Sequence, residues 1–70
     1  MYESIEDLPM VCRLNLPEDA LQVYRDEFNR AWRQTARYRA AQDHAWHEVR
    51  KKFERDEKTG RWVQKWSSGD

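Results

Sequence analysis

The 70-residue sequence has few of the residues that form catalytic and ligand-binding loops. Its two glycines, Gly60 and Gly69, are too few for a glycine-rich phosphate loop, and no acidic calcium loop surrounds either. The single cysteine, Cys12, excludes an internal disulfide and fits a buried thiol in a reducing compartment. No apolar run approaches the roughly 20 residues of a membrane span, and the N-terminus does not resemble a signal peptide. These absences favour a soluble, cytoplasmic protein without membrane insertion.

Catalytic and metal-binding patterns are also missing. His44 and His47 are spaced to share a metal ion on one helix, but a metal site needs three or four ligands and Cys12 is distant in sequence. No acidic residue lies in an apolar run that would raise its pKa for acid–base catalysis. We therefore expect no catalytic residue, no metal and no cofactor, and a protein that is not an enzyme.

Aromatic residues are abundant by contrast. Nine of the 70 residues are aromatic, and four of these are tryptophan, although 37% of the chain is charged. Disordered chains have few aromatic residues, so this composition indicates a small aromatic core beneath a large charged surface. We expect one domain over residues 1–70, with 67–70 as a frayed tail.

Proline spacing and apolar periodicity predict helices. The pairs Leu8-Pro9 and Leu16-Pro17 each indicate a helix start, and the first leaves room for one or two turns. From Pro17 onward, one stripe recurs at spacings of three and four: Leu21, Tyr24, Phe28, Ala31, Trp32, Thr35 and Tyr38. A second stripe follows: Ala41, Ala45, Trp46, Val49 and Phe53. The pattern weakens between Arg37 and Asp43, and Asp43 is a suitable N-cap. We therefore favour two helices, over about 17–38 and 43–56.

One continuous helix over residues 17–56 is the alternative. It would be about 60 Å long, far beyond the size of a compact 70-residue domain. Its apolar stripe would then need a second chain, as in a domain-swapped homodimer. The sequence therefore leaves a monomer and a homodimer open.

The C-terminal residues predict a change of structure. Lys58-Thr59-Gly60 favours a turn, and an extended segment after it would place Trp62, Gln64 and Trp66 on one face. We expect a short hairpin or single strand. The predicted fold is mainly α: a small helical domain with a short N-terminal helix, two longer helices and a minor C-terminal β element.

The net charge of zero conceals two oppositely charged segments. Residues 1–27 contain seven acidic and two basic residues (net −5), and residues 28–55 contain eight basic and three acidic residues (net +5). The simplest interpretation is that the two segments meet within the fold. The alternative is a basic surface for a partner, formed by Arg30, Arg33 and Arg37 on one helix face and by Arg50, Lys51, Lys52 and Arg55 in a second group.

Several landmarks occur together in a specific order. They are Asp7-Leu8-Pro9, Leu16-Pro17, Phe28-Asn29-Arg30-Ala31-Trp32, His44-Ala45-Trp46 with Val49 and Phe53, and Gly60-Arg61-Trp62. Over residues 2–66 the chain resembles the ChaB family, small bacterial proteins that also occur in viral genomes and are named as cation transport regulators. The resemblance implies a small helical domain, no catalytic residues, and a protein that modulates a sodium/calcium–proton antiporter. The chain has a shorter connection between its two tryptophan motifs than the family pattern, which implies either a tight turn or fused helices.

These observations lead to one functional hypothesis and one alternative. We expect a non-enzymatic domain that binds a protein partner, with an antiporter or its regulator as the partner that the resemblance implies. The predicted contact residues are Arg33, Arg37, Arg50, Lys51 and Trp66, where Trp66 is the tryptophan that the core pattern covers least. The alternative is a regulator associated with nucleic acid, of the kind carried by phages, that uses the same arginines. The balanced charge, and aromatic residues on a different stripe from the arginines, make nucleic acid the weaker hypothesis.

Overall fold

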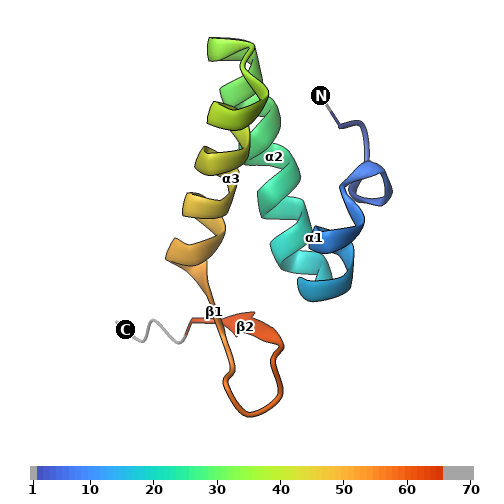
Figure 1. Cartoon of the computed structure of the whole chain (residues 1–70), viewed down its shortest axis with the longest axis vertical. Helices are drawn as coiled ribbons and strands as arrows, with labels where there is room; N and C mark the ends of the chain where they lie inside the picture. The colour runs from blue at the N-terminus through green and yellow to red at the C-terminus, as the bar shows by residue number, and fades with distance from the viewer. Residues whose placement is uncertain (1, 66–70) are drawn as a thin grey trace.

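The computed structural model describes residues 2–65 as a small helical domain that ends in a β hairpin (Figure 1). The elements, in order, are η1 (Ile5–Asp7), α1 (Met10–Asn15), α2 (Glu18–Thr35), α3 (Tyr38–Lys52), β1 (Phe53–Arg55) and β2 (Trp62–Gln64). This architecture confirms the predicted fold class. Helices α1 and α2 begin directly after Pro9 and Pro17, as the proline pairs predict.

The break between the two long helices lies earlier than the sequence pattern predicts. Helix α2 ends at Thr35, and Ala36 adopts a left-handed conformation with φ of 54°. The Thr35 hydroxyl donates to the carbonyl of Ala31 at 3.0 Å and accepts the Arg37 N–H at 3.2 Å, so it serves the end of one helix and the start of the next. The predicted N-cap at Asp43 is wrong, because Asp43 lies inside α3, and the single continuous helix is not formed.

The second long helix also ends earlier than predicted. Residues 53–55 form β1, which pairs antiparallel with β2 so that Phe53 faces Gln64 and Arg55 faces Trp62. The turn between the strands contains Gly60 at φ of 77°, a conformation that favours glycine. The helical interpretation of residues 53–56 is therefore wrong, although Phe53 is buried as its position in the apolar stripe predicts.

The core lies mainly between α2 and α3, which run side by side in opposite directions (Figure 1). Helix α2 contributes the large side chains Tyr24 and Phe28, both almost completely buried. Helix α3 presents small or short side chains to them at Ala41, Ala45 and Val49, all with no exposed area. Large residues on one helix against small residues on the other allow close packing.

The three tryptophans among residues 2–65 lie at the edge of this core. Trp32, Trp46 and Trp62 are half-buried and pack against the core cluster, so they cover it without forming its centre. The Trp46 ring lies edge-on to Tyr24, with centroids 5.4 Å apart, and 5.9 Å from the ring of Trp62. Through these contacts Trp46 joins the helices to the hairpin.

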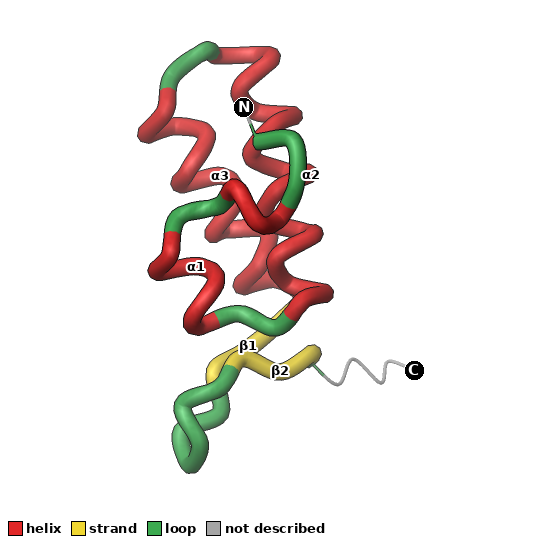
Figure 2. The backbone as a smooth tube through the Cα atoms, turned by 90° about the vertical axis from the view of Figure 1, so that its right-hand side faces the viewer, coloured by secondary structure: helices red, strands yellow, loops and turns green. Residues whose placement is uncertain are grey.

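The N-terminal segment, residues 2–16, lies across one face of the α2–α3 pair (Figure 2). It buries Leu8, Cys12 and Leu16, which are four residues apart and belong to the same core cluster. The molecule is elongated, with principal extents of 35 × 27 × 17 Å and a radius of gyration of 12.3 Å. Within residues 2–65, no helix has the length and hydrophobicity to cross a membrane.

Candidate functional site

Arg33 and Arg37 flank the turn between α2 and α3. Arg33 lies in the last turn of α2, and Arg37 caps the start of α3. Both residues are exposed, and neither side chain forms an ion pair or a hydrogen bond within residues 2–65. The prediction that Arg30, Arg33 and Arg37 share one helix face is wrong, because α2 ends before Arg37.

Arg50 and Lys51 lie in the last turn of α3. The Arg50 guanidinium carbon is 5.8 Å from the centre of the Trp46 ring, a cation–π contact. The Lys51 ammonium is 3.5 Å from the carboxylate of Glu48, one helical turn earlier. Positive charge at this position also stabilises the C-terminal end of the helix dipole, so these residues already have structural contacts.

The structure does not bring the predicted contact residues into one site. Arg33 and Arg37 lie at one end of the α2–α3 pair, and Arg50 and Lys51 lie near the other end. Thirteen helical residues from Arg37 to Arg50 correspond to about 20 Å along α3. Trp66 lies outside the described residues. The basic side chains therefore form two separate groups.

The group at the α2–α3 turn, Arg33 and Arg37, continues along the outer face of α2 through further polar residues. A hollow of about 310 Å³ is lined by Arg25, Asp26, Asn29, Arg30 and Arg33. Arg30 is 3.8 Å from Glu27, and Arg25 is 2.9 Å from Asp26. Sequence analysis did not include Arg25, which the i, i+4 and i+8 spacing from Arg25 to Arg33 could have identified.

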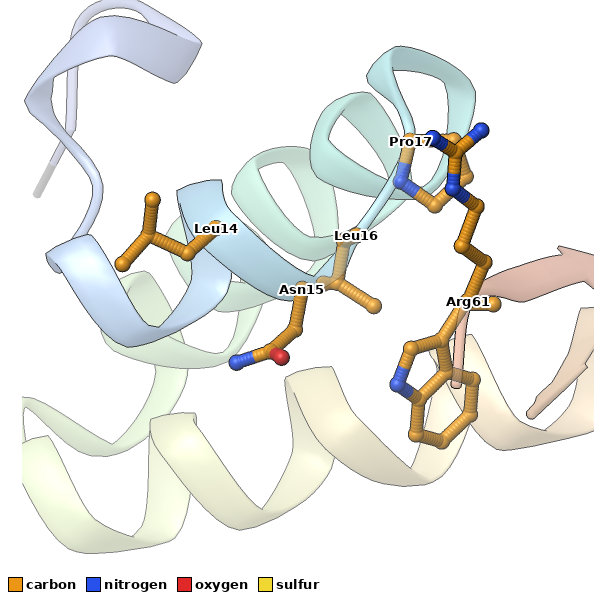
Figure 3. Close-up of a pocket in the computed structure, with 6 residues that line it drawn as sticks. Leu14, Asn15, Leu16, Pro17 and Arg61 are labelled. Atoms are coloured by element: carbon orange, nitrogen blue, oxygen red, sulfur yellow. The ribbon is translucent and has the colours of Figure 1, made fainter. Parts of the chain in front are cut away.

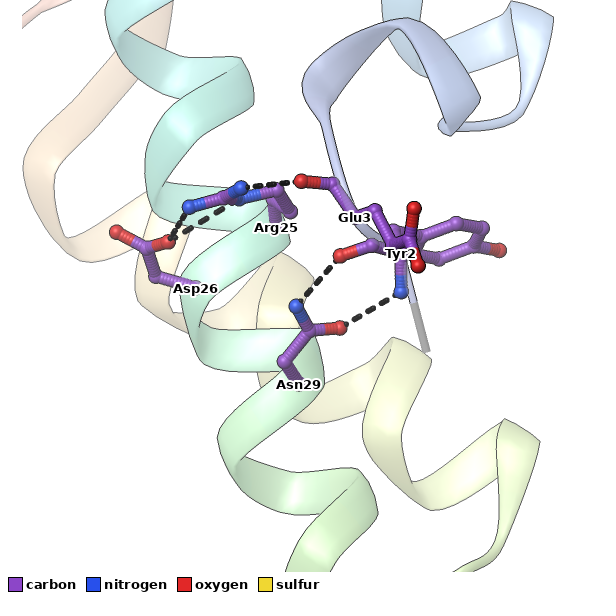
Figure 4. Close-up of polar contacts among 5 residues, drawn as sticks. All are labelled: Tyr2, Glu3, Arg25, Asp26 and Asn29. Atoms are coloured by element: carbon purple, nitrogen blue, oxygen red, sulfur yellow. Dashed lines mark hydrogen bonds and ion pairs between the residues drawn. The ribbon is translucent and has the colours of Figure 1, made fainter.

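Asn29 and Arg25 hold the N-terminal segment against α2 (Figure 4). The Asn29 amide nitrogen donates to the Tyr2 carbonyl at 2.7 Å, and its oxygen accepts the Tyr2 N–H at 2.9 Å. One Arg25 nitrogen donates to the Glu3 carbonyl at 2.7 Å. Asn29 therefore pairs with both backbone groups of one residue, as a neighbouring strand would.

Beneath this contact, a thiol and phenols lie in an apolar environment. Burial raises the pKa of the Cys12 thiol, so it is a poor nucleophile. Burial also raises the pKa of Tyr24 above its ordinary value, and the Tyr24 hydroxyl has no hydrogen-bond partner among residues 2–65. The Tyr2 hydroxyl lies 3.3 Å from that of Tyr38, and burial raises the pKa of Tyr2 as well. The cluster is structural, because these groups are held in their neutral forms.

Glu27 is the point where the acidic segment contacts the basic one. Its carboxylate lies 2.9 Å from His44 Nε2 and 3.8 Å from Arg30. No other ion pair within residues 2–65 joins the two segments, so their opposite charges are mostly directed to solvent. Among the same residues, no three acidic, histidine or cysteine side chains are grouped to hold a metal ion.

A second surface was missed by sequence analysis. Met10, Val11 and Leu14 on α1 expose 66%, 57% and 76% of their area. Their spacing of one, three and four residues places them together on the outer side of this short helix. The exposed apolar residues could have been found from the sequence, because α1 has apolar residues at 10, 11, 12 and 14, too many for one buried face.

Comparison with known proteins identifies the family. The family model described as ChaB matches residues 8–65, which is most of the chain and includes both long helices and the hairpin. No curated protein matches the chain. No solved structure matches it either. The match over residues 8–65 confirms the resemblance found in the sequence motifs, and the chain belongs to the ChaB family.

Proposed function

We propose that the protein is a non-enzymatic regulator of cation transport that acts by binding a protein partner. Membership of the ChaB family, which is named for cation transport regulation, supports this function. The observation that carries the binding role is the pair Arg33 and Arg37, exposed at the α2–α3 turn without a counter-charge among residues 2–65. Arginine at such a position can form paired hydrogen bonds with a carboxylate of the partner.

The partner that the family name suggests is a sodium/calcium–proton antiporter or a protein that controls it. An acidic loop of such a partner would pair with Arg33 and Arg37. Arg50 and Lys51 would provide a second and weaker contact, because they already interact with Trp46 and Glu48. The described tryptophans support protein binding over nucleic acid, since Trp32, Trp46 and Trp62 pack against the core and offer few free faces for stacking.

A transport assay tests this function. The antiporter is reconstituted in vesicles that contain a pH-sensitive dye, and sodium- or calcium-driven proton flux is measured with and without the protein. We expect the wild-type protein to change the flux, and the double variant Arg33→Glu/Arg37→Glu to lose this effect. Lys58→Glu is the matched control, because it changes an exposed charge in the hairpin turn.

Two results would contradict the proposal. The first is an unchanged flux together with no binding of the purified antiporter in detergent. The second is binding of mixed DNA or RNA at micromolar protein, with an affinity that falls steeply with salt and is lost in the double variant. The second result would support the nucleic-acid alternative.

A further inference from the structure

The outer face of α1 is apolar although folding does not require it. The inner face of the same segment already provides Leu8, Cys12 and Leu16 to the core. Of the large apolar side chains that are exposed within residues 2–65, Met10 and Leu14 have the largest exposed fractions, 66% and 76%. Single exposed apolar residues are ordinary, but a group of three on a six-residue helix is typical of an interaction surface.

Two hollows lie beside this face, and Leu14 lines both. The first, about 240 Å³, is also lined by Ile5, Met10 and Leu21. The second, about 280 Å³, continues past the end of α1 to Pro17 and Trp62 on the hairpin. Figure 3 shows Leu14 on α1, with Leu16 and Pro17 following along the second hollow. The result is an apolar ridge between two depressions, a shape that can receive side chains from one face of a helix.

The charged residues that line the two hollows are two arginines and one glutamate. Arg13 lines the first hollow and Arg61 lines the second, where its side chain extends toward Pro17 (Figure 3). Neither arginine takes part in an ion pair within the described chain. Glu6 also lines the first hollow, so the lining of the two hollows carries two positive groups and one negative group.

We propose that this α1 surface, formed by Met10, Val11, Leu14 and the two flanking hollows, binds an amphipathic helix of a partner protein whose apolar face is bordered by acidic residues. The apolar side chains would enter the hollows on either side of Leu14, and the acidic residues would pair with Arg13 and Arg61. This surface is separate from Arg33 and Arg37, because α2, about 27 Å long, lies between the two sites. The proposal therefore does not rest on the role of the α2–α3 turn.

A designed peptide tests the proposal directly. The probe is a fluorescein-labelled helix of about 18 residues with leucine along one face and glutamate on both borders, and the comparison peptide has lysine in place of glutamate. Fluorescence anisotropy with the full chain should show binding of the glutamate peptide. We expect Leu14→Ser to weaken that binding by at least about tenfold. Arg13→Glu/Arg61→Glu should weaken it and favour the lysine peptide.

The matched control is Val63→Ser on β2, which removes an exposed apolar side chain that lines neither hollow and should leave affinity unchanged. The proposal is overturned if both peptides bind equally, or if Leu14→Ser binds as well as the wild type. It is also overturned if light scattering shows a dimer that Leu14→Ser dissociates, or if Leu14→Ser abolishes binding to phosphatidylglycerol vesicles. Those two results would assign the surface to a second copy or to a lipid surface. Circular dichroism of each variant confirms that it is folded.

Discussion

Helices α1 and α2 use their apolar residues in different ways. Helix α2 directs Tyr24 and Phe28 into the core, while its outer side carries charged residues such as Arg30 and Arg33. Helix α1 buries Cys12 but exposes Met10, Val11 and Leu14 on its other side. Because an amphipathic helix needs one apolar side to fold, the apolar residues of α2 are explained by folding alone and those of α1 are not. The apolar residues that stabilise the fold and the apolar residues that are free to bind a partner therefore lie on different helices.

Removing a core ring from α2 should have the largest effect on stability. Phe28→Ala removes a ring that is 1% exposed and contacts Tyr2, Trp32 and Tyr38. We expect a loss of about 3–5 kcal/mol, a large fraction of the stability of so small a domain. Urea unfolding followed by tryptophan fluorescence measures it. Leu14→Ala on α1 is the comparison, and we expect it to change stability by less than about 0.5 kcal/mol.

This pair of variants also shows whether the outer face of α1 stabilises the fold. Similar losses for Phe28→Ala and Leu14→Ala would mean that α1 contributes to the core through its outer face. The α1 surface would then have a structural role, and its exposure would no longer argue for binding.

Loosening the N-terminal segment from α2 should have an intermediate effect. Asn29→Ala leaves the N–H and carbonyl of Tyr2 without their partners at 2.9 and 2.7 Å. We expect a loss of about 1–3 kcal/mol, because these groups are partly buried. Compared with the wild type, Asn29→Ala should exchange backbone amide hydrogens faster in the N-terminal segment, and this increase should be larger there than in α3. Gln22→Ala, an exposed amide on the same helix, is the control and should leave both measurements unchanged. An equal increase in exchange rate in the N-terminal segment and in α3 of Asn29→Ala would contradict a local role for Asn29.

Alkaline pH should lower stability by weakening the contact between the N-terminal segment and α2. We expect this effect to be smaller than those of Phe28→Ala and Asn29→Ala. Burial raises the pKa values of Cys12, Tyr2 and Tyr24 above their ordinary values of 9.0 and 10.0, so the folded state holds these protons more tightly than the unfolded state. Their contribution to stability is complete below these ordinary values. It begins to be lost as pH rises above 9.0 for the thiol and above 10.0 for the phenols, and the loss continues up to the raised pKa values of the folded state. Urea midpoints across this range should therefore fall. The variant Cys12→Ala/Tyr24→Phe should show a weaker dependence, and an unchanged or rising wild-type midpoint would contradict this prediction.

Local signals explain which parts of the fold could be predicted from the sequence. Pro9 and Pro17 fix helix starts through their own backbone geometry, and the apolar stripe predicts the buried side of α2. The helix break was placed too late because no glycine marks it. Ala36 instead takes the left-handed conformation, and the Thr35 hydroxyl supplies the capping contacts. A threonine at this position also fits a helix interior, so its capping role depends on the tertiary fold.

The candidate sites depended more strongly on contacts distant in sequence. Sequence spacing placed Arg33 and Arg37 on one helix face, which is wrong because α2 ends before Arg37, and it could not show that Arg50 and Lys51 lie near the other end of the domain. It also could not show that Asn29 pairs with Tyr2, 27 residues away. Both facts follow from the antiparallel arrangement of α2 and α3 and from the path of the N-terminal segment across them.

The short turn at Ala36–Arg37 has a consequence for how the chain folds. Because two residues join α2 to α3, the first contacts between the helices form between residues that are close in sequence. Closing such a short loop costs little entropy, and local contacts favour rapid folding. We therefore expect the helical hairpin to form early, with the N-terminal segment docking on it afterwards through Asn29. The N-terminal segment would then also be the first to detach when the protein begins to unfold.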